Sequence, residues 1–237
     1  MKLPLSYSEQ ANATTAFIFQ RVSLAVCILL MPFSITLYLL SWEGNQRAPL
    51  TPLITSAMAG PIGNTLHFTG AIAASFFLPL GYLGMSLLGM RRAPWLATLS
   101  AALSLIGWIP WAALMGLDSL AYDINQLGRT AQFVALWTHF NGDLVMTIYL
   151  LIYIIGHLLS AVLIGFMLGR LHLVPAWSAW AFALTSPLTI PIILVHNLVF
   201  QDVLKYLLCI LWILGSIPAA LAMFKNKDLA QPEPPPA

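Results

Sequence analysis

Long apolar segments separated by polar turns account for most of the chain. A helix needs about 20 consecutive apolar residues to cross the hydrocarbon core of a bilayer. Six such segments follow one another, at residues 16–41, 65–89, 95–116, 143–168, 175–198 and 203–224. The pattern therefore predicts an all-α integral membrane protein, built as a bundle of six transmembrane helices.

The two ends of the chain differ from this apolar core. Residues 1–15 lack the apolar stretch of a cleavable signal peptide, so we expect the first span to stay in the protein. The final residues, AQPEPPPA, are too polar and too rich in proline to pack. We therefore expect a cytoplasmic N-terminal segment (1–15), a six-helix membrane domain (16–224) and a disordered cytoplasmic tail (225–237).

The composition supports a membrane protein and excludes several function classes. Only 8% of the 237 residues are charged and 59% are hydrophobic, whereas a soluble domain usually carries about 25% charged residues. This excludes an ordinary soluble enzyme, a disordered chain and a nucleic-acid binder, which needs a basic face. The sequence also lacks a phosphate-binding glycine loop with a lysine, an HExxH motif and a CxxC motif. The lipid bilayer is therefore the expected partner.

The distribution of basic residues predicts the orientation of the bundle. With the N-terminus in the cytoplasm, more basic residues face the cytoplasm than the outside, as the positive-inside rule requires. The compact six-span pattern also resembles that of small bacterial membrane proteins, so we expect the bacterial inner membrane, with both termini cytoplasmic. The inner residues are Lys2, Arg21, Arg91, Arg92, Arg170, Lys225 and Lys227, and the outer residues are Arg47, Arg129 and Lys205. Five acids also fall on the outer side: Glu43, Asp118, Asp123, Asp143 and Asp202.

Two stretches share an ordered set of landmarks. The tetrapeptides HFTG at 67–70 and HFNG at 139–142 open the second and fourth spans. Each is followed by an apolar helix, a basic turn with proline and tryptophan, and an Ile-Pro pair at 109–110 or 190–191. This order predicts that spans 2–3 and 4–5 are copies of one helical hairpin. Their common direction makes them a parallel repeat about the membrane normal.

Ionisable side chains within a membrane are costly, so each is a candidate functional group. Three histidines fall near the outer ends of predicted spans, and the fourth span carries a polar stripe at about 100° per residue. We expect this stripe to face the bundle interior, beside carbonyls that prolines in the spans leave free. The pattern predicts an outward-facing pocket with a ligand or proton site at His67, His139, Asp143, Thr147, His157 and His196.

Asp143 lies within the first turns of the fourth predicted span. An unpaired, ionised carboxylate costs roughly 3 kcal/mol at the centre of a membrane helix. We therefore expect Asp143 to face the interior and to form a hydrogen bond with a histidine or hydroxyl of another helix, His67 or His196 first of all, or with His139 of the same helix. Such a pair would titrate as a coupled unit.

Three function classes use these residues differently, and the sequence leaves them open. The first is binding or transport of a small solute or ion, coupled to protons through histidine and Asp143. The second is a membrane oxidoreductase with zinc or haem b as cofactor, and the third is an accessory subunit without a site. Zinc would bind His67, His139, His196 and Asp143, and haem would take His67 and His139, or Met85 and His157, as axial ligands.

Overall fold

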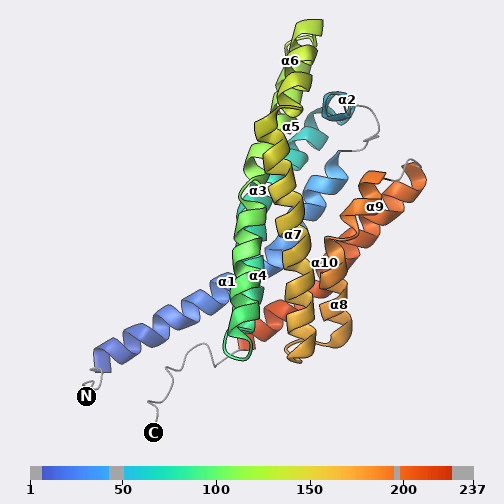
Figure 1. Cartoon of the computed structure of the whole chain (residues 1–237). Helices are drawn as coiled ribbons and strands as arrows, with labels where there is room; N and C mark the ends of the chain where they lie inside the picture. The colour runs from blue at the N-terminus through green and yellow to red at the C-terminus, as the bar shows by residue number, and fades with distance from the viewer. Residues whose placement is uncertain (1–6, 43–50, 195–197, 226–237) are drawn as a thin grey trace.

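The computed structural model describes residues 7–42, 51–194 and 198–225. Within these ranges every regular element is an α-helix (Figure 1). The helices are α1 (Tyr7–Ser41), α2 (Thr51–Met58), α3 (Gly60–Leu88), α4 (Pro94–Trp108), α5 (Trp111–Gln126), α6 (Ala131–Asn141), α7 (Leu144–Arg170), α8 (Ala176–Thr185), α9 (Thr189–Leu194) and α10 (Leu198–Lys225).

Five helical segments in the described part of the chain are long and apolar enough to cross a membrane. Two lie within α1 and α10, two coincide with α3 and α7, and one comprises α4 and α5 together. They are Thr15–Ser41, Gly60–Leu88, Pro94–Gln126, Leu144–Arg170 and Val199–Lys225. The prediction of an all-helical, multi-pass membrane protein is confirmed at this level.

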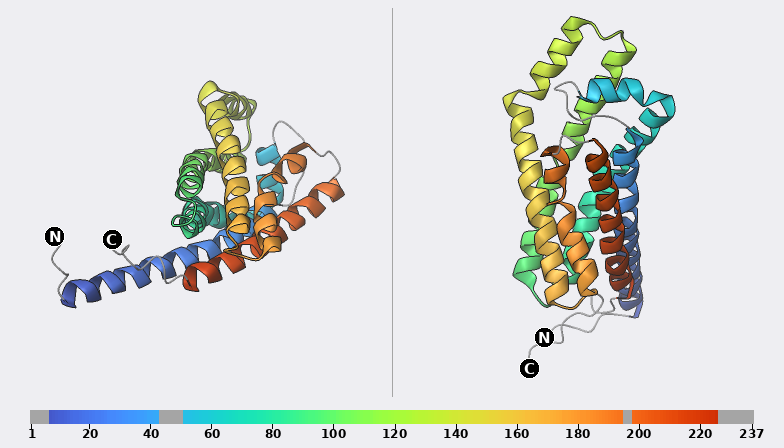
Figure 2. Two further views of the ribbon diagram at one scale, coloured as in Figure 1. Left: turned by 60° about the horizontal axis from the view of Figure 1, so that its bottom comes forward. Right: turned by 90° about the vertical axis from the view of Figure 1, so that its right-hand side faces the viewer.

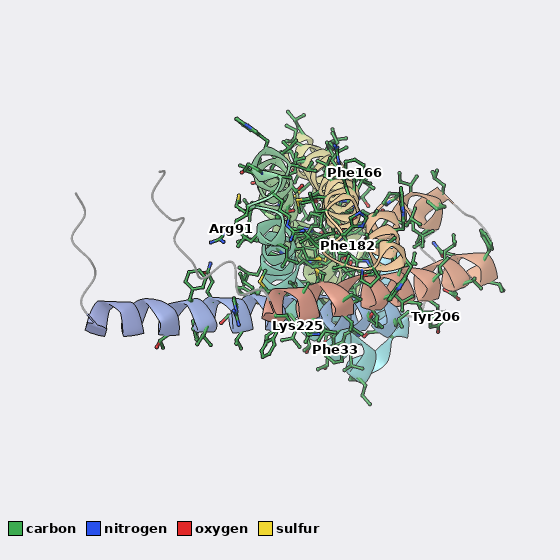
Figure 3. All side chains as sticks on the ribbon, turned by 90° about the horizontal axis from the view of Figure 1, so that it is seen from below. Phe33, Arg91, Phe166, Phe182, Tyr206 and Lys225 are labelled. Carbon is green, nitrogen blue, oxygen red and sulfur yellow. The ribbon has the colours of Figure 1, made fainter. Side chains whose placement is uncertain are left out.

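The distribution of polarity is inverted relative to that of a soluble protein. Phe33 and Tyr206 are 66% and 58% exposed, whereas His67 and Asp118 are buried. Figure 3 shows the first two projecting from the outside of the bundle, with Phe182 inside it. Because a lipid surface favours apolar groups and penalises charge, this bundle contacts the bilayer with its outer surface and keeps its polar groups inside.

Two long helices cross the rest of the bundle at an angle. α1 and α10 pack side by side and run in opposite directions (Figure 2). Arg21 on α1 donates a hydrogen bond to the carbonyl oxygen of Phe224 on α10, at 3.2 Å. α3 also packs against α1, and α4 packs against α7. α8 contacts both α7 and α10.

The bundle has two distinct ends. α2, α6 and α9 lie at one of them, which we call the α6 end (Figure 1). The opposite end, which we call the terminal end, holds the turns at 89–93 and 171–175. Arg92 joins these two turns by donating to the carbonyl oxygen of Leu171 at 3.1 Å. α10 also ends there, and α1 begins on the same side (Figure 2).

The third predicted span is longer than the sequence pattern suggested. We expected it to end at residue 116, but the helical segment continues through α5 to Gln126. Pro110 does not end it, because this residue takes a helical conformation (φ −67°, ψ −16°) at the N-cap of α5, where no backbone N–H is needed. Asp118, which we had assigned to the outside, therefore lies within this segment.

The predicted fifth span, 175–198, is not one continuous helix. It divides into α8 and α9, which are separated by a turn at residues 186–188. Pro187 lies in this turn and has no N–H to continue the helical hydrogen-bond ladder. Neither half is long enough to count among the five membrane-crossing helices.

Two glycines allow helices to approach closely at the positions that orient the candidate site. A Cβ atom on Gly107 of α4 would lie 2.6 Å from the backbone carbonyl carbon of Gly156 on α7. A Cβ atom on Gly70 of α3 would lie 2.9 Å from the Cα atom of Tyr38 on α1. Such small-residue crossings are typical of membrane helices. They place His157 and His67 against their neighbours.

Candidate functional site

A cavity of about 310 Å³ lies in the bundle between α1, α4, α5, α7, α9 and α10. This volume is within the range of pockets that hold small molecules, roughly 300–1,000 Å³. Its wall is mostly apolar and rich in aromatic rings, which favours a ligand with an apolar body. The aromatic residues that line it, His157 aside, are Tyr38, Trp108, Trp111, Trp137, Tyr153 and Trp212.

Polar side chains from five helices and the turn at 186–188 also reach this cavity. Because buried polar groups require partners, those without a protein partner indicate where a ligand binds. The polar side chains, apart from the two tyrosine hydroxyls, are Asp118, Asn141, His157, Ser186, Thr189 and Lys205.

His67 and Asp118 form a buried pair at the wall of the cavity. Nε2 of His67, which is 2% exposed, lies 3.3 Å from Oδ2 of Asp118. The Tyr38 hydroxyl donates to the same carboxylate oxygen at 3.2 Å, and Nδ1 of His67 lies 3.0 Å from the Tyr38 carbonyl oxygen. The indole of Trp42 stacks on the imidazole, with ring centroids 3.6 Å apart and planes 5° apart. The pair is thus fixed by α1, α3 and α5.

The hydrogen-bond partners of His67 determine how many protons the pair holds. A carbonyl oxygen only accepts, so Nδ1 must carry a hydrogen. Nε2 faces a carboxyl oxygen, so this contact requires one more proton, carried either by Nε2 or by Asp118. In both cases the pair is neutral overall, which suits a site inside a membrane. Without that proton, two lone pairs would face each other.

Asn64 fixes the surroundings of His67, three residues earlier on α3. Its side-chain oxygen accepts from the indole N–H of Trp42 at 2.9 Å. Its amide nitrogen donates to the carbonyl oxygens of Ser56 and Gly60, both at 2.8 Å. Asn64 therefore ties the end of α1 and the α2 segment to the first turn of α3. This network holds Trp42 in place over the His67 ring.

His157, in the middle of α7, presents an unpaired ring nitrogen. Its Nδ1 donates to the carbonyl oxygen of Tyr153 at 2.6 Å, so the neutral ring carries its hydrogen there. Nε2 is then an acceptor, and it is buried without a hydrogen-bond partner among the described residues. The ring stacks on Tyr153, with centroids 4.3 Å apart and planes 18° apart. A cavity ligand with an O–H or N–H group would satisfy this nitrogen.

Lys205 brings a buried amino group to the cavity wall. The residue is 5% exposed, and its Nζ lies 3.5 Å from Oδ1 of Asp202. The Asp202 side chain is 59% exposed, so water weakens its attraction for the lysine. An ammonium group has three donors, and this one long contact uses one of them. Lys205 therefore has donors left for a ligand.

Among the described residues Asp143 forms no hydrogen bond or ion pair with a histidine, and His196, one of its predicted partners, lies outside them. Asp143 is the N-cap residue of α7, and its carboxylate accepts a hydrogen bond from the backbone N–H of Met146 at 2.8 Å. An N-cap aspartate satisfies a free amide and interacts favourably with the positive end of the helix dipole. This local role explains a carboxylate here without a functional site. The buried acid that pairs with His67 is Asp118.

The predicted stripe on the fourth span is broken. His139 belongs to α6, which ends at Asn141, and α7 starts only at Leu144. His139 and Thr147 are exposed, whereas His157 is buried. We expected one continuous helix to place His139, Thr147 and His157 on one face. The turn at 142–143 instead separates His139 from the other two. His196 lies outside the described residues.

In the described part of the chain, which leaves out His196, the geometry brings together neither the predicted metal ligands nor a predicted pair of haem ligands. Among the described residues there is no group of three or more His, Cys, Asp or Glu side chains that could hold a metal ion. Both ring nitrogens of His67 are engaged by Tyr38 and Asp118, and His139 is exposed on α6. Met85 is fully buried in the apolar core and does not line the cavity that His157 lines.

The sequence interpretation missed three residues of the site: Tyr38, Asp118 and Lys205. A helical spacing identifies the last two. On α5, positions 111, 114, 115 and 118 all line the cavity, and on α10 positions 205, 208 and 212 do. This spacing of three and four residues marks one face of a helix. Continuing the apolar face of the third span past residue 116 would have included Asp118.

Comparisons with known proteins do not assign the chain to a family. No family model matches the chain, and neither a curated protein nor a solved structure is significantly similar to it. The function must therefore be argued from the cavity itself.

Proposed function

We propose that this multi-pass membrane protein binds a small solute in the central cavity and moves it across the membrane together with a proton. The observation that supports this proposal is the His67–Asp118 pair, which is buried at the cavity wall and needs a shared proton for its 3.3 Å contact. A buried acid beside a histidine is a common proton carrier in membrane transport. Here the proton site and the solute site share Asp118.

The bundle has two arrangements in this proposal, one with the shared proton and one without it. With it, His67 of α3, Asp118 of α5 and Tyr38 of α1 are held together by hydrogen bonds. Without it, Nε2 and the carboxylate repel each other and the contact must open. Because the three residues come from three helices, opening loosens the bundle beside the cavity. The change of charge at this pair thus shifts the equilibrium between two packing arrangements of the helices.

The proposal also includes the finer topology that the sequence predicts. The chain crosses the membrane six times, with α8 and α9 together as a broken fifth crossing, both termini in the cytoplasm and the cavity open to the outside. In support, α7 and α10 both end at the terminal end, so α8 and α9 return the chain between them (Figure 1). In this proposal α3–α4 and α7–α8 are two copies of one helical hairpin. The protein lies in the inner membrane of a bacterium.

Proton movement in reconstituted vesicles tests the function. The purified full-length protein is placed in liposomes that contain the pH dye pyranine. Small carboxylic acids, amines and neutral solutes are then added outside one at a time, with protein-free liposomes as the background. We expect at least one solute to change the internal pH faster with the protein than without it.

Two variants connect that signal to the pair. Asp118→Asn removes the acidic proton of the pair, so we expect solute-driven proton movement to be lost while solute binding, measured by calorimetry, remains. Asp123→Asn is the matched control, because Asp123 is an exposed acid on the same helix. The proposal is overturned if no solute of the panel moves protons, or if Asp118→Asn moves them as fast as the unaltered protein.

A further inference from the structure

Two unlike polar groups lie at opposite ends of the cavity. Lys205, Leu208 and Trp212 line it along one face of α10, and the seven residue steps from Lys205 to Trp212 span about 10 Å of helix. His157 lies at the Trp212 end, because it comes 13 residues before the end of α7 and Trp212 comes 13 residues before the end of α10, and both helices end at the terminal end. A chain of aromatic contacts also links them: the ring centroids of His157 and Trp108 are 5.6 Å apart, those of Trp108 and Tyr82 5.5 Å, and those of Tyr82 and Trp212 5.8 Å.

The Lys205 end favours an anionic group. Its ammonium is buried and has a long contact with the exposed carboxylate of Asp202. The cavity's own acid, Asp118, is part of the neutral pair with His67 and supplies no net charge there. A carboxylate on a ligand would take up the remaining donors of Lys205 in short, charge-assisted hydrogen bonds. An ammonium on a ligand would be repelled.

The His157 end favours a hydrogen-bond donor. Its Nδ1–H is already used by the Tyr153 carbonyl, and its Nε2 is a buried acceptor without a protein partner in the described part of the chain. A hydroxyl group of a ligand that reaches this nitrogen would donate to it. A ligand with only an apolar group here would leave the acceptor unsatisfied, which is unfavourable.

Aromatic rings line the space between these two ends. Trp108, Trp111 and Tyr153 line one wall, and their ring centroids are 5.5–5.7 Å apart. Trp212 lines the cavity from α10. Aromatic side chains bind a planar ring well through edge-to-face and offset contacts. The body of the ligand is therefore best supplied by an aromatic ring.

We infer that the solute is a small hydroxyaryl carboxylic acid. Its carboxylate binds Lys205, its ring lies among the tryptophans, and its distal hydroxyl group donates to Nε2 of His157. This inference rests on the proposed function, because it names the class of solute that the same cavity takes.

Three probes that differ in one group each test the two ends separately. They are 3-(4-hydroxyphenyl)propanoate, 3-phenylpropanoate without the hydroxyl, and 2-(4-hydroxyphenyl)ethylamine, which replaces the carboxylate by an ammonium. Binding to the purified full-length protein is measured by isothermal titration calorimetry. We expect the hydroxy acid to bind about 10-fold more tightly than phenylpropanoate and more than about 10-fold more tightly than the amine.

Two substitutions assign these preferences to residues. Lys205→Met should remove the preference for acid over amine and keep the preference for the hydroxyl group. His157→Phe keeps a ring against Tyr153 but has no acceptor, so it should remove only the hydroxyl preference. Lys225→Met is the control for loss of a lysine on α10, since this residue is exposed at the end of the helix. Gel filtration of each variant checks that it is folded.

The outcomes separate this inference from the proposed function. If the unaltered protein binds the amine or phenylpropanoate as tightly as the hydroxy acid, the inference is wrong, whether or not a variant folds. If another solute of the panel drives protons, the proposed function still holds. If the hydroxy acid binds with the expected preferences but no solute moves protons, the inference stands and transport is wrong.

Discussion

Nε2 of His67 lies 3.3 Å from Oδ2 of Asp118, which is 51 residues later in the chain. The two residues come from α3 and α5, and the Tyr38 hydroxyl of α1 donates to the same carboxylate oxygen. This contact gives the bundle a buried pair that carries no net charge while the carboxyl group and the imidazole share a proton. It also connects the pair to the cavity, because Asp118 lies in the cavity wall.

Removal of the Asp118 carboxyl group should destabilise the protein. Asp118→Ala leaves the Tyr38 hydroxyl and Nε2 of His67 buried without the hydrogen-bond partner that they share, which costs about 1–3 kcal/mol per group. We expect a clear fall in the midpoint of thermal unfolding in detergent. Asp123→Ala removes an exposed acid of the same helix and should change stability by less than about 0.5 kcal/mol. Equal effects of the two substitutions would argue against the buried pair.

Asp143 should matter for stability and not for proton movement. Asp143→Ala removes the hydrogen bond to the Met146 amide and should cost about 1 kcal/mol. Asp143→Ser keeps a capping oxygen and should recover most of that loss. Both variants should move protons in liposomes at the rate of the unaltered protein. A loss of proton movement in Asp143→Ser would restore this residue as a site candidate.

Close packing of α4 on α7 should not tolerate a side chain at the crossing. Gly156→Val places atoms into the backbone of Gly107, and overpacking of this kind typically costs about 1–3 kcal/mol. We expect a lower thermal midpoint and weaker solute binding, because the next residue is His157. Gly116→Ala is the matched control, since a Cβ there meets nothing within 4 Å. That variant should be as stable as the unaltered protein or slightly more stable.

Reporter fusions should place the terminal end in the cytoplasm. Arg91, Arg92, Arg170 and Lys225 all belong to this end, and the positive-inside rule assigns such residues to the cytoplasm. Green fluorescent protein fused after residue 237 should fluoresce, and alkaline phosphatase at the same place should be inactive. The same reporters inserted after Gly128, between α5 and α6, should give the opposite result. Active phosphatase at the C-terminus would reverse the proposed orientation.

Part of the candidate site followed from the sequence and part did not. His67 and His157 were expected at a buried site, and both are buried. Asp143 was expected within the first turns of a continuous span, but a turn at 142–143 separates α6 from α7 and makes this residue the N-cap of α7. Asp118 was assigned to the outside because the local drop in hydropathy after residue 116 was taken as the end of a span.

The sequence by itself determined that the chain is helical and crosses a membrane several times. The reason is local: in lipid each backbone N–H and C=O must be satisfied within its own segment, so the length of an apolar run is enough to predict a crossing. Which polar side chains meet was decided only by the tertiary structure. It depends on the rotation of each helix about its axis and on close approach at Gly70 and Gly156. No single segment encodes these relations between helices, and they brought Asp118 to His67.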